Sequence, residues 1–317
     1  MAETKIEWTS TTAPDGTKKP GYSFNPWIGC MKVNDDCKFC YAETFATNRM
    51  GRFGKLWGPE KSSERHRTSS GYWQKALSWN EQAKKDGVRR KVFCASMADI
   101  FEDNTTIVEW RKELWELIWK TPFLDWLMLT KRPYNIAAML PPDWGEGYPN
   151  VWLGTSIGHG DRWDMAVPLL MVPAAIHFIS YEPATADLDL KWTVEPALGT
   201  QSRVTGQNTI DWVICGGESG PGARPFNIEW ARNMKKQCHD NGVAFFMKQM
   251  GAVWAKENHA KDKKGGDMEE WPEDLRVREY PNEFPETISI SNPISTAVIA
   301  RRFGRMFPNA KFNDKED

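Results

Sequence analysis

The sequence predicts an α/β fold, a partial TIM-like (β/α) barrel of about six parallel strands with an irregular C-terminal extension. Short apolar runs alternate with segments of helical periodicity from about residue 90 to residue 250, as in βαβ units whose strands form a parallel sheet. Polar residues follow the apolar runs, where α/β folds build their sites. A chain of 317 residues is long enough for one barrel-like domain.

Strands are expected wherever a short apolar run is bounded by polar residues. Six such runs cover residues 91–95, 126–130, 151–156, 176–180, 212–215 and 244–248. A seventh strand is expected near the cysteine-rich N-terminal part, and residues 5–8 also have a strand-like pattern. Six strands plus one fit a part-barrel better than a small doubly wound sheet.

Helices are expected before and between these strands. The best marked covers residues 107–120, because apolar residues recur at helical spacing behind cap candidates at 104–106. The others cover residues 41–50, 72–85, 134–140, a segment after Asp161, and 227–241. Residues 295–306 also have a helical pattern.

The alternating pattern divides the chain into three parts. Residues 1–29 form an N-terminal segment, residues 30–250 the part-barrel, and residues 251–317 a C-terminal extension or lid. The last boundary is placed where the alternation stops, since residues 257–287 are rich in charge, glycine and proline.

Composition narrows the class of protein. There is no apolar signal segment and no run of about 18 apolar residues, so we expect a cytoplasmic protein without membrane association. The formal net charge of -1 gives no global nucleic-acid signature, so any such contact must come from local patches. Basic and aromatic residues interleave at 49–57, 65–67 and 301–305, either as phosphate contacts or as solvated faces. The oligomeric state is not defined by the sequence.

Three cysteines, Cys30, Cys37 and Cys40, fall within eleven residues. In a cytoplasmic protein, clustered cysteines indicate metal or redox chemistry more than a disulfide framework. Three thiolates can complete a zinc site with a fourth ligand, or hold three irons of a 4Fe-4S cluster whose fourth iron stays open. The nearest histidine, His66, lies beyond a long connector, which favours the iron-sulfur cluster without excluding zinc.

A set of motifs then resembles a known family. The set comprises Asn25-Pro-Trp-Ile-Gly-Cys30, Cys37-x-x-Cys40-Tyr41-Ala42, Leu129-Thr-Lys-Arg-Pro133, Trp152-Leu-Gly-Thr-Ser156, Ile179-Ser-Tyr-Glu-Pro183 and Gly216-Gly-Glu-Ser-Gly220. Over residues 3 to about 250 the chain resembles the phage-associated three-cysteine family of radical S-adenosylmethionine enzymes, of the thymidine-hypermodification type. It departs from the family in an insert at residues 11–23, and its first cysteine gap is longer than is common in the superfamily.

The resemblance implies a function. A 4Fe-4S cluster on the three cysteines would bind S-adenosylmethionine, accept an electron from an external reductant and generate a 5'-deoxyadenosyl radical that abstracts a substrate hydrogen. The implied substrate is DNA or a modified nucleotide, and the implied reaction isomerises N-linked glycinyl-thymine to the Cα-linked form in the host cytoplasm. The alternatives are another radical base modification or repair, and a zinc-stabilised nucleic-acid-binding protein without catalysis.

Candidate site residues lie mainly at the strand ends. The expected cofactor contacts are Phe39, near adenine by the resemblance, and Ser96, Asp99, Thr155, Ser156, Glu182, Gly216, Gly217 and Glu218. Carboxylates suit an ammonium or ribose hydroxyls, and paired glycines let a backbone approach closely. Lys131 and Arg132 are the expected anion contacts, and His159 is a candidate acid or base. The remaining cysteines, Cys94, Cys215 and Cys238, are expected to be structural and not to form a second cluster.

Overall fold

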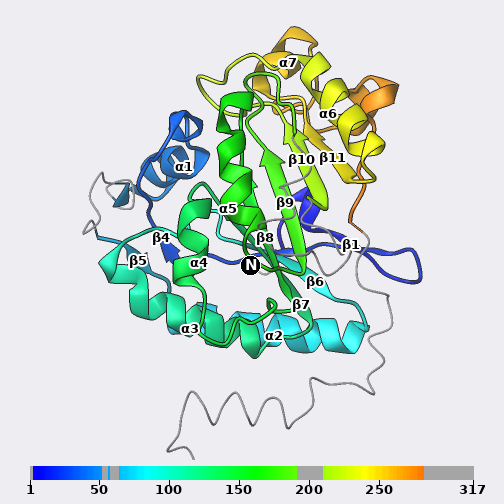
Figure 1. Ribbon diagram of the computed structural model, residues 1–317. Helices are drawn as coiled ribbons and strands as arrows, with labels where there is room; N and C mark the ends of the chain where they lie inside the picture. The colour runs from blue at the N-terminus through cyan, green and yellow to red at the C-terminus, as the bar shows by residue number, and fades with distance from the viewer. Residues whose placement is uncertain (1–2, 52–55, 58–63, 191–209, 282–317) are drawn as a thin grey trace, which may run out of the picture. The chain divides into compact units, whose positions relative to one another are not determined.

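The computed structural model describes residues 3–51, 56–57, 64–190 and 210–281 (Figure 1). Residues Met1–Pro281 form one compact unit. No helix in the described part of the chain is long and apolar enough to cross a membrane. The helical pattern at residues 295–306 lies outside the described residues.

A seven-stranded parallel sheet runs through the unit (Figure 1). Its order is β11-β10-β9-β8-β7-β6-β3, so strands that follow one another along the chain from β6 onward are neighbours in space. The strands are β3 (Tyr22–Ser23), β6 (Arg90–Cys94), β7 (Leu124–Thr130), β8 (Val151–Ser156), β9 (Ile176–Tyr181), β10 (Trp212–Gly216) and β11 (Ala244–Gln249). The predicted α/β half-barrel is confirmed, including its seventh strand before the cysteines.

Because all seven strands are parallel, their C-terminal ends lie along one edge of the sheet, which we call the carboxyl edge. This edge is where barrels of this class carry their sites. The strand ends singled out in the sequence therefore belong to one side of the half-barrel.

The main helices match the predicted ones within a few residues, except for the last one, which the sequence pattern did not predict. They are α1 (Tyr41–Arg49), α2 (Ser70–Asp86), α3 (Val108–Trp119), α4 (Ile136–Met139), α5 (Ala166–Leu170), α6 (Ile228–Asp240) and α7 (Ala252–Glu257). Gly87, with a φ of 65°, ends α2 in the left-handed conformation that glycine adopts without strain. Asn227 caps α6 by accepting a hydrogen bond from the Glu229 N–H.

Shorter elements complete the unit. There are two antiparallel pairs, β1 (Thr11–Thr12) with β2 (Lys18–Lys19) and β4 (Trp27–Ile28) with β5 (His66–Arg67). The 3-10 helices are η1 (Glu7–Thr9), η2 (Asp35–Cys37), η4 (Thr105–Ile107), η5 (Pro133–Asn135), η6 (Gly160–Met165), η8 (Met268–Glu270) and η9 (Glu273–Leu275). The prediction of a strand at residues 5–8 is wrong. The Thr9 and Ser10 hydroxyls donate to the carbonyls of Ile6 and Glu7 and stabilise a turn there instead.

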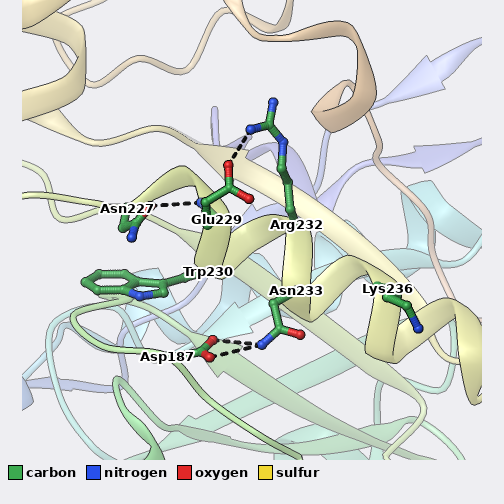
Figure 2. Close-up of a pocket in the computed structure, with 7 residues that line it drawn as sticks. All are labelled: Asp187, Asn227, Glu229, Trp230, Arg232, Asn233 and Lys236. Carbon is green, nitrogen blue, oxygen red and sulfur yellow. Dashed lines mark hydrogen bonds and ion pairs between the residues drawn. The ribbon is translucent and has the colours of Figure 1, made fainter.

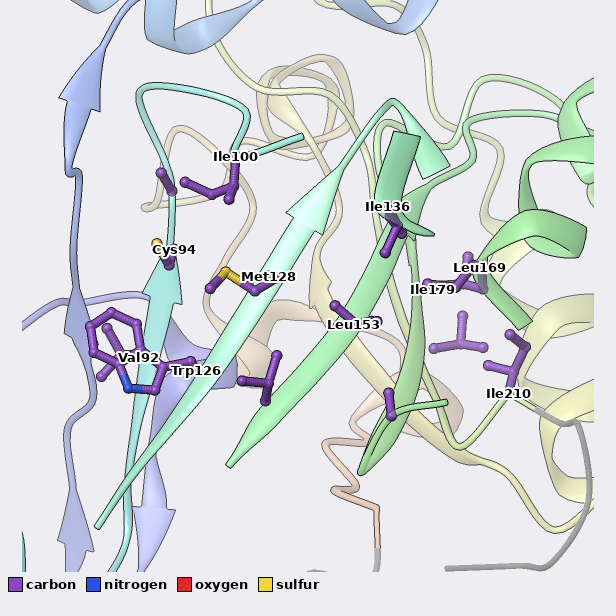
Figure 3. Packing of buried hydrophobic residues seen from close by; sticks show 14 of the residues in the cluster. Val92, Cys94, Ile100, Trp126, Met128, Ile136, Leu153, Leu169, Ile179 and Ile210 are labelled. Carbon is purple, nitrogen blue, oxygen red and sulfur yellow. The ribbon is translucent and has the colours of Figure 1, made fainter. Parts of the chain in front are cut away.

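One face of the sheet, the helix face, packs against the helices. Alternate strand residues such as Val92, Trp126 and Leu153 lie on it (Figure 3). They share one buried cluster with residues of α2, α3, α5 and α6. Alternation along each strand places the intervening residues on the opposite face. Cys94 and Cys215 are buried in this cluster, as their apolar strand runs predict, and Cys238 of α6 is buried with them.

The opposite face, which we call the aromatic face, holds a second buried cluster of Trp8, Phe93, Leu127, Trp152, Ala175, Ile176, Phe178, Trp212, Ile214 and Phe246. Gly154 makes room for the Phe178 ring, because a Cβ on residue 154 would lie 2.4 Å from that ring. Trp8 and Tyr280 come from the two ends of the described chain and both contact Trp212. Large side chains thus fill the aromatic face below the carboxyl edge.

Residues 251–281 belong to the same compact unit as the sheet. The backbone of residues 277–279 pairs with the outer edge of β11, through Met247 N–H to the Val277 carbonyl and Glu279 N–H to the Phe245 carbonyl, both at 2.9 Å. Tyr280 donates a hydrogen bond to the Glu7 carbonyl at 3.0 Å. The described N- and C-terminal segments are therefore joined across the aromatic face.

Candidate functional site at the carboxyl edge

The cysteine loop, residues 30–40, is joined to the strand ends of the half-barrel. At its start, the Gly29 N–H donates to the Met97 carbonyl at 3.0 Å, just after β6. At its end, the Tyr41 hydroxyl donates to the Ser96 carbonyl at 2.8 Å. In its middle, Asp36 accepts a hydrogen bond from the Gly158 N–H, after β8, at 3.2 Å. The loop therefore spans several strand ends of the carboxyl edge.

Local interactions shape the loop around its cysteines. Asn34 caps η2 by accepting a hydrogen bond from the Asp36 N–H at 3.1 Å. The same amide oxygen lies 3.5 Å from the Cys37 thiol, which donates to it. Cys40 is the N-cap residue of α1, so the third thiol lies where the loop becomes a helix.

Cys30 lies beside a buried cation. The Arg132 Nη1 is 3.5 Å from the Cys30 sulfur, and the thiol itself donates to the Met31 carbonyl at 3.4 Å. Burial raises the pKa of the Cys30 thiol to about 12, although Arg132 acts in the opposite direction. Arg132 is thus the charge that would stabilise a thiolate here.

Arg132 itself belongs to a buried network of ion pairs. It donates to Asp99 at 2.8 Å and lies 3.7 Å from Glu102. Glu102 also accepts from Arg65 at 2.8 Å and from the Met31 N–H at 2.8 Å. This network joins the first residues of the cysteine loop to the ends of β6 and β7. It also corrects the sequence interpretation of Arg65, which is 3% exposed and belongs neither to a solvated face nor to a surface phosphate patch.

The donor set fits an iron-sulfur cluster in its chemistry. Cys30, Cys37 and Cys40 are all free thiols in one loop, and a cluster would take one thiolate on each of three irons. The side chains themselves do not converge, since the described residues contain no group of three His, Cys, Asp or Glu arranged around one metal ion. His66, remote in sequence, pairs opposite Ile28 through β4 and β5, and it joins no such group either.

Polar side chains gather at the carboxyl end of the aromatic face, in a set we call the polar layer: Lys131, Ser156, Ser180, Glu182 and Lys248. Lys131 Nζ donates to the Ser156 hydroxyl at 3.3 Å, and Lys248 Nζ pairs with Glu182 at 2.9 Å. Ser180 donates to Glu182 at 3.5 Å. A Cβ on Gly216 would lie 2.6 Å from the Glu182 carboxylate, so glycine there leaves space for this carboxylate.

Other predicted contacts lie apart from this layer. Thr155 is fully buried and donates to the Thr130 carbonyl at 3.0 Å. Asp99, besides pairing with Arg132, accepts from the Thr130 hydroxyl at 2.8 Å and from the Lys131 N–H at 3.1 Å. Ser96 lies 3.2 Å from the Ser23 hydroxyl of β3. In the described structure these three side chains connect neighbouring strands.

A third group forms after β10. Glu218 accepts two hydrogen bonds from the Arg224 side chain, at 2.8 and 3.0 Å, and this pairing raises the pKa of Arg224. The Arg224 guanidinium lies 5.7 Å from the centre of the Phe39 ring, and a Cβ on Gly222 would lie 3.2 Å from that ring. The loop after β10 therefore packs on the cysteine loop at Phe39. Gly217 is needed nearby, since a Cβ there would meet the Met250 carbonyl oxygen at 2.3 Å.

His159 is half-buried and immediately precedes η6, beyond the end of β8. Sequence reasoning missed Glu102 and Arg224 and gave Arg65 a different role, although all three hold the cysteine loop or its neighbours. The available signal was that carboxylates after a buried strand need cationic partners. The sequence does not show which cation is the partner, because Arg65 lies 37 residues before Glu102 and the two meet only in the folded chain.

A separate open hollow of about 540 Å³ lies beside the start of α6 (Figure 2). Its ionisable groups pair with one another or with nearby residues, as in Glu229 with Arg232 and Asp187 with Asn233. It contains no cysteine and none of the predicted site residues. The carboxyl edge is therefore the better candidate site.

Comparisons with known proteins add the family. The profile of DUF5131, described as a protein of unknown function, matches residues 3–278. The chain belongs to this family. No curated protein matches it. Among solved structures, a mutant of spore photoproduct lyase is similar with a TM-score of 0.40 and 11% identity, covering 96% of this chain and 79% of that one. A similarity this distant carries no argument about the function of a DUF5131 protein.

Proposed function

We propose that this DUF5131 protein is a radical S-adenosylmethionine enzyme that modifies a nucleic-acid base. The observation that carries the proposal is the place of the three free thiols, in one loop that is hydrogen-bonded to the carboxyl edge of a parallel half-barrel. Cys30, Cys37 and Cys40 would hold a 4Fe-4S cluster. When bound, such a cluster supplies the electron that cleaves S-adenosylmethionine to a hydrogen-abstracting 5'-deoxyadenosyl radical. The motif set described above supports the same function.

The residues around the loop have distinct roles in this proposal. Arg132, fixed by Asp99, positions Cys30 and places a positive charge beside its sulfur. The polar layer offers hydrogen bonds to a ligand at the same edge. The filled aromatic face excludes water from below, which protects a reactive centre from side reactions.

The first test is the cluster itself. After anaerobic reconstitution with iron and sulfide, we expect a coloured protein with bound iron and sulfide. With reductant and S-adenosylmethionine it should release 5'-deoxyadenosine. Cys30→Ala, Cys37→Ala and Cys40→Ala should each abolish that release, whereas Cys238→Ala, in the buried cluster of the helix face, should retain it. A colourless protein with stoichiometric zinc would instead support the binding protein without catalysis.

The finer proposal concerns the substrate. Isomerisation of N-linked glycinyl-thymine to the Cα-linked form rests on the motif resemblance, and Lys131 of the polar layer suits the glycine carboxylate. DNA carrying the modified base should yield a nucleoside of unchanged mass and altered retention on liquid chromatography with mass spectrometry. A product of different mass would indicate another base modification or a repair reaction. If the DNA is unchanged while 5'-deoxyadenosine is still released, this substrate is excluded and the radical chemistry is still supported.

A further inference from the structure

The polar layer carries an excess of positive charge. It contains two lysines and one glutamate, so it has a net charge of +1 when all three are ionised. Lys248 and Glu182 form an ion pair at 2.9 Å and neutralise each other. The excess charge therefore belongs to Lys131.

Lys131 differs from the other cations of the carboxyl edge. Arg132 pairs with Asp99, Arg224 with Glu218 and Lys248 with Glu182. In the described part of the chain, the contact of the Lys131 ammonium is the neutral Ser156 hydroxyl at 3.3 Å, and no carboxylate lies within ion-pair distance. A half-buried ammonium with no carboxylate at ion-pair distance in the described part of the chain can donate charge-assisted hydrogen bonds to an anionic ligand.

We infer that Lys131 and Ser156 bind an anionic group of a ligand, either a carboxylate or a phosphate. An ammonium has three donors, and Ser156 takes one of them. The Ser156 hydroxyl accepts that bond, which leaves its own hydrogen to donate to the same anion. Ser156 is 1% exposed and fixed on β8, so its hydroxyl provides a fixed acceptor that holds the Lys131 ammonium at the carboxyl end of the aromatic face.

The position of this anion site follows from the chain. Lys131 directly precedes Arg132, whose guanidinium is 3.5 Å from the Cys30 sulfur. Both residues follow the end of β7, and their contacts show that Lys131 faces the polar layer while Arg132 faces the cysteine loop. The inference rests on the proposed function only in placing the anion beside the reacting centre, since anion binding itself needs no cluster.

The test uses the full chain without reconstitution and two anionic probes. One probe is S-adenosylmethionine, which has a carboxylate, and the other is a single-stranded DNA of about twelve nucleotides. Binding is compared between wild type, Lys131→Met, Lys131→Arg and the control Lys112→Met on α3, whose side chain is 67% exposed. Lys131→Met should lower the binding affinity for one probe by about tenfold or more, as expected for the loss of a charge-assisted hydrogen bond. Lys131→Arg keeps the positive charge, so its affinity for both probes should stay within about threefold of wild type.

The affected probe identifies the source of the anion. Weaker S-adenosylmethionine binding assigns the site to the cofactor carboxylate. Weaker DNA binding assigns the site to the nucleic acid. In that case the binding constant for DNA should also depend less steeply on salt concentration, by about the amount expected for one phosphate contact. Equal binding of both probes by wild type and Lys131→Met, or no binding of either by wild type, overturns the inference. A chain that fails to form a cluster but still shows the Lys131 effect would contradict the proposed function and support the anion site.

Discussion

Lys131 and Arg132 are adjacent in the sequence and have opposite environments. The sequence predicts both as anion contacts, because both follow the same strand. In the structure Arg132 is 7% exposed and pairs with Asp99 beside Cys30, whereas Lys131 contacts the polar layer. Strand alternation alone predicts that they face different sides. The sequence could not show which side holds the carboxylates, since Glu102 reaches Arg132 through the tertiary fold and is itself paired with Arg65.

The first prediction concerns Arg132. Arg132→Met removes the cation from a buried network and leaves Asp99 and Glu102 without it. The free energy of unfolding should therefore fall by about 3–5 kcal/mol. Arg132→Lys retains a charge and should lose less. Urea unfolding measures the change.

The same variant should release Cys30 from its contact with Arg132. We expect slower alkylation of Cys30 in folded Arg132→Met, because the reactive thiolate loses the cation that stabilises it, measured for each cysteine by mass spectrometry, with Cys238 as the buried reference. An unchanged alkylation rate at Cys30 would show that Arg132 does not stabilise its thiolate.

The second prediction concerns His177, which is buried on the helix face beside the Val172 carbonyl. Burial lowers the pKa of His177 from 6.5 to about 4. Between these values the unfolded chain binds a proton that the folded chain does not, so stability falls as pH decreases from about 6.5 to 4. The loss should reach about 3 kcal/mol.

Urea unfolding between pH 7 and pH 4.5 measures this effect. His177→Gln should reduce the pH dependence of the unfolding free energy, whereas His239→Gln, at a side chain that is 90% exposed, should leave it unchanged. Identical slopes in wild type and His177→Gln would contradict a neutral buried His177.

At the scale of elements, apolar runs were sufficient to predict the six main strands within two residues, because a strand buried on both faces is apolar nearly throughout. The two-residue strands β4 and β5 were too short for periodicity to reveal, and β3 was expected near the cysteines without defined bounds. The pairing of residues 277–279 with β11 was also hidden, since it uses backbone groups that any sequence provides. Edge pairing is therefore the part of this sheet that sequence patterns do not define.

The third prediction concerns the contact between β8 and β9. Gly154→Ala places a methyl group where the buried Phe178 ring lies, and should destabilise the fold by about 1–3 kcal/mol. Gly71→Ala is the matched control, because a Cβ at this position on α2 meets nothing within 4 Å and alanine favours a helix. Thermal unfolding compares the two. Phe178→Leu should relieve the Gly154→Ala defect in the double variant, and no relief would argue against this contact.

At the scale of the whole molecule, the sequence places a boundary near residue 250, and the sheet continues beyond it through residues 277–279. Trp271 and Leu275 are buried in the same cluster as the helices of the helix face. The lid function predicted for residues 251–317 stays a prediction. Charge and glycine content concealed the structured part of this region, because its apolar residues are few and widely spaced.

The fourth prediction tests this organisation by truncation. A chain ending at Pro281 retains the compact unit and should unfold cooperatively near the wild-type temperature. A chain ending at Met250 loses the backbone pairing with β11 and the buried Trp271 and Leu275, so it should lose cooperative unfolding or aggregate. Differential scanning calorimetry distinguishes the two. A stable chain ending at Met250 would show that residues 251–281 are dispensable for folding.

The filled aromatic face has a kinetic consequence. Trp8, Trp212 and Tyr280 pack together on the aromatic face, so a ligand of the proposed site would reach the polar layer from the carboxyl edge and not through this face. If two ligands share that approach, the one bound deeper has to enter first and leave last. We therefore expect compulsory-order kinetics, in which a saturating second ligand slows the escape of the first.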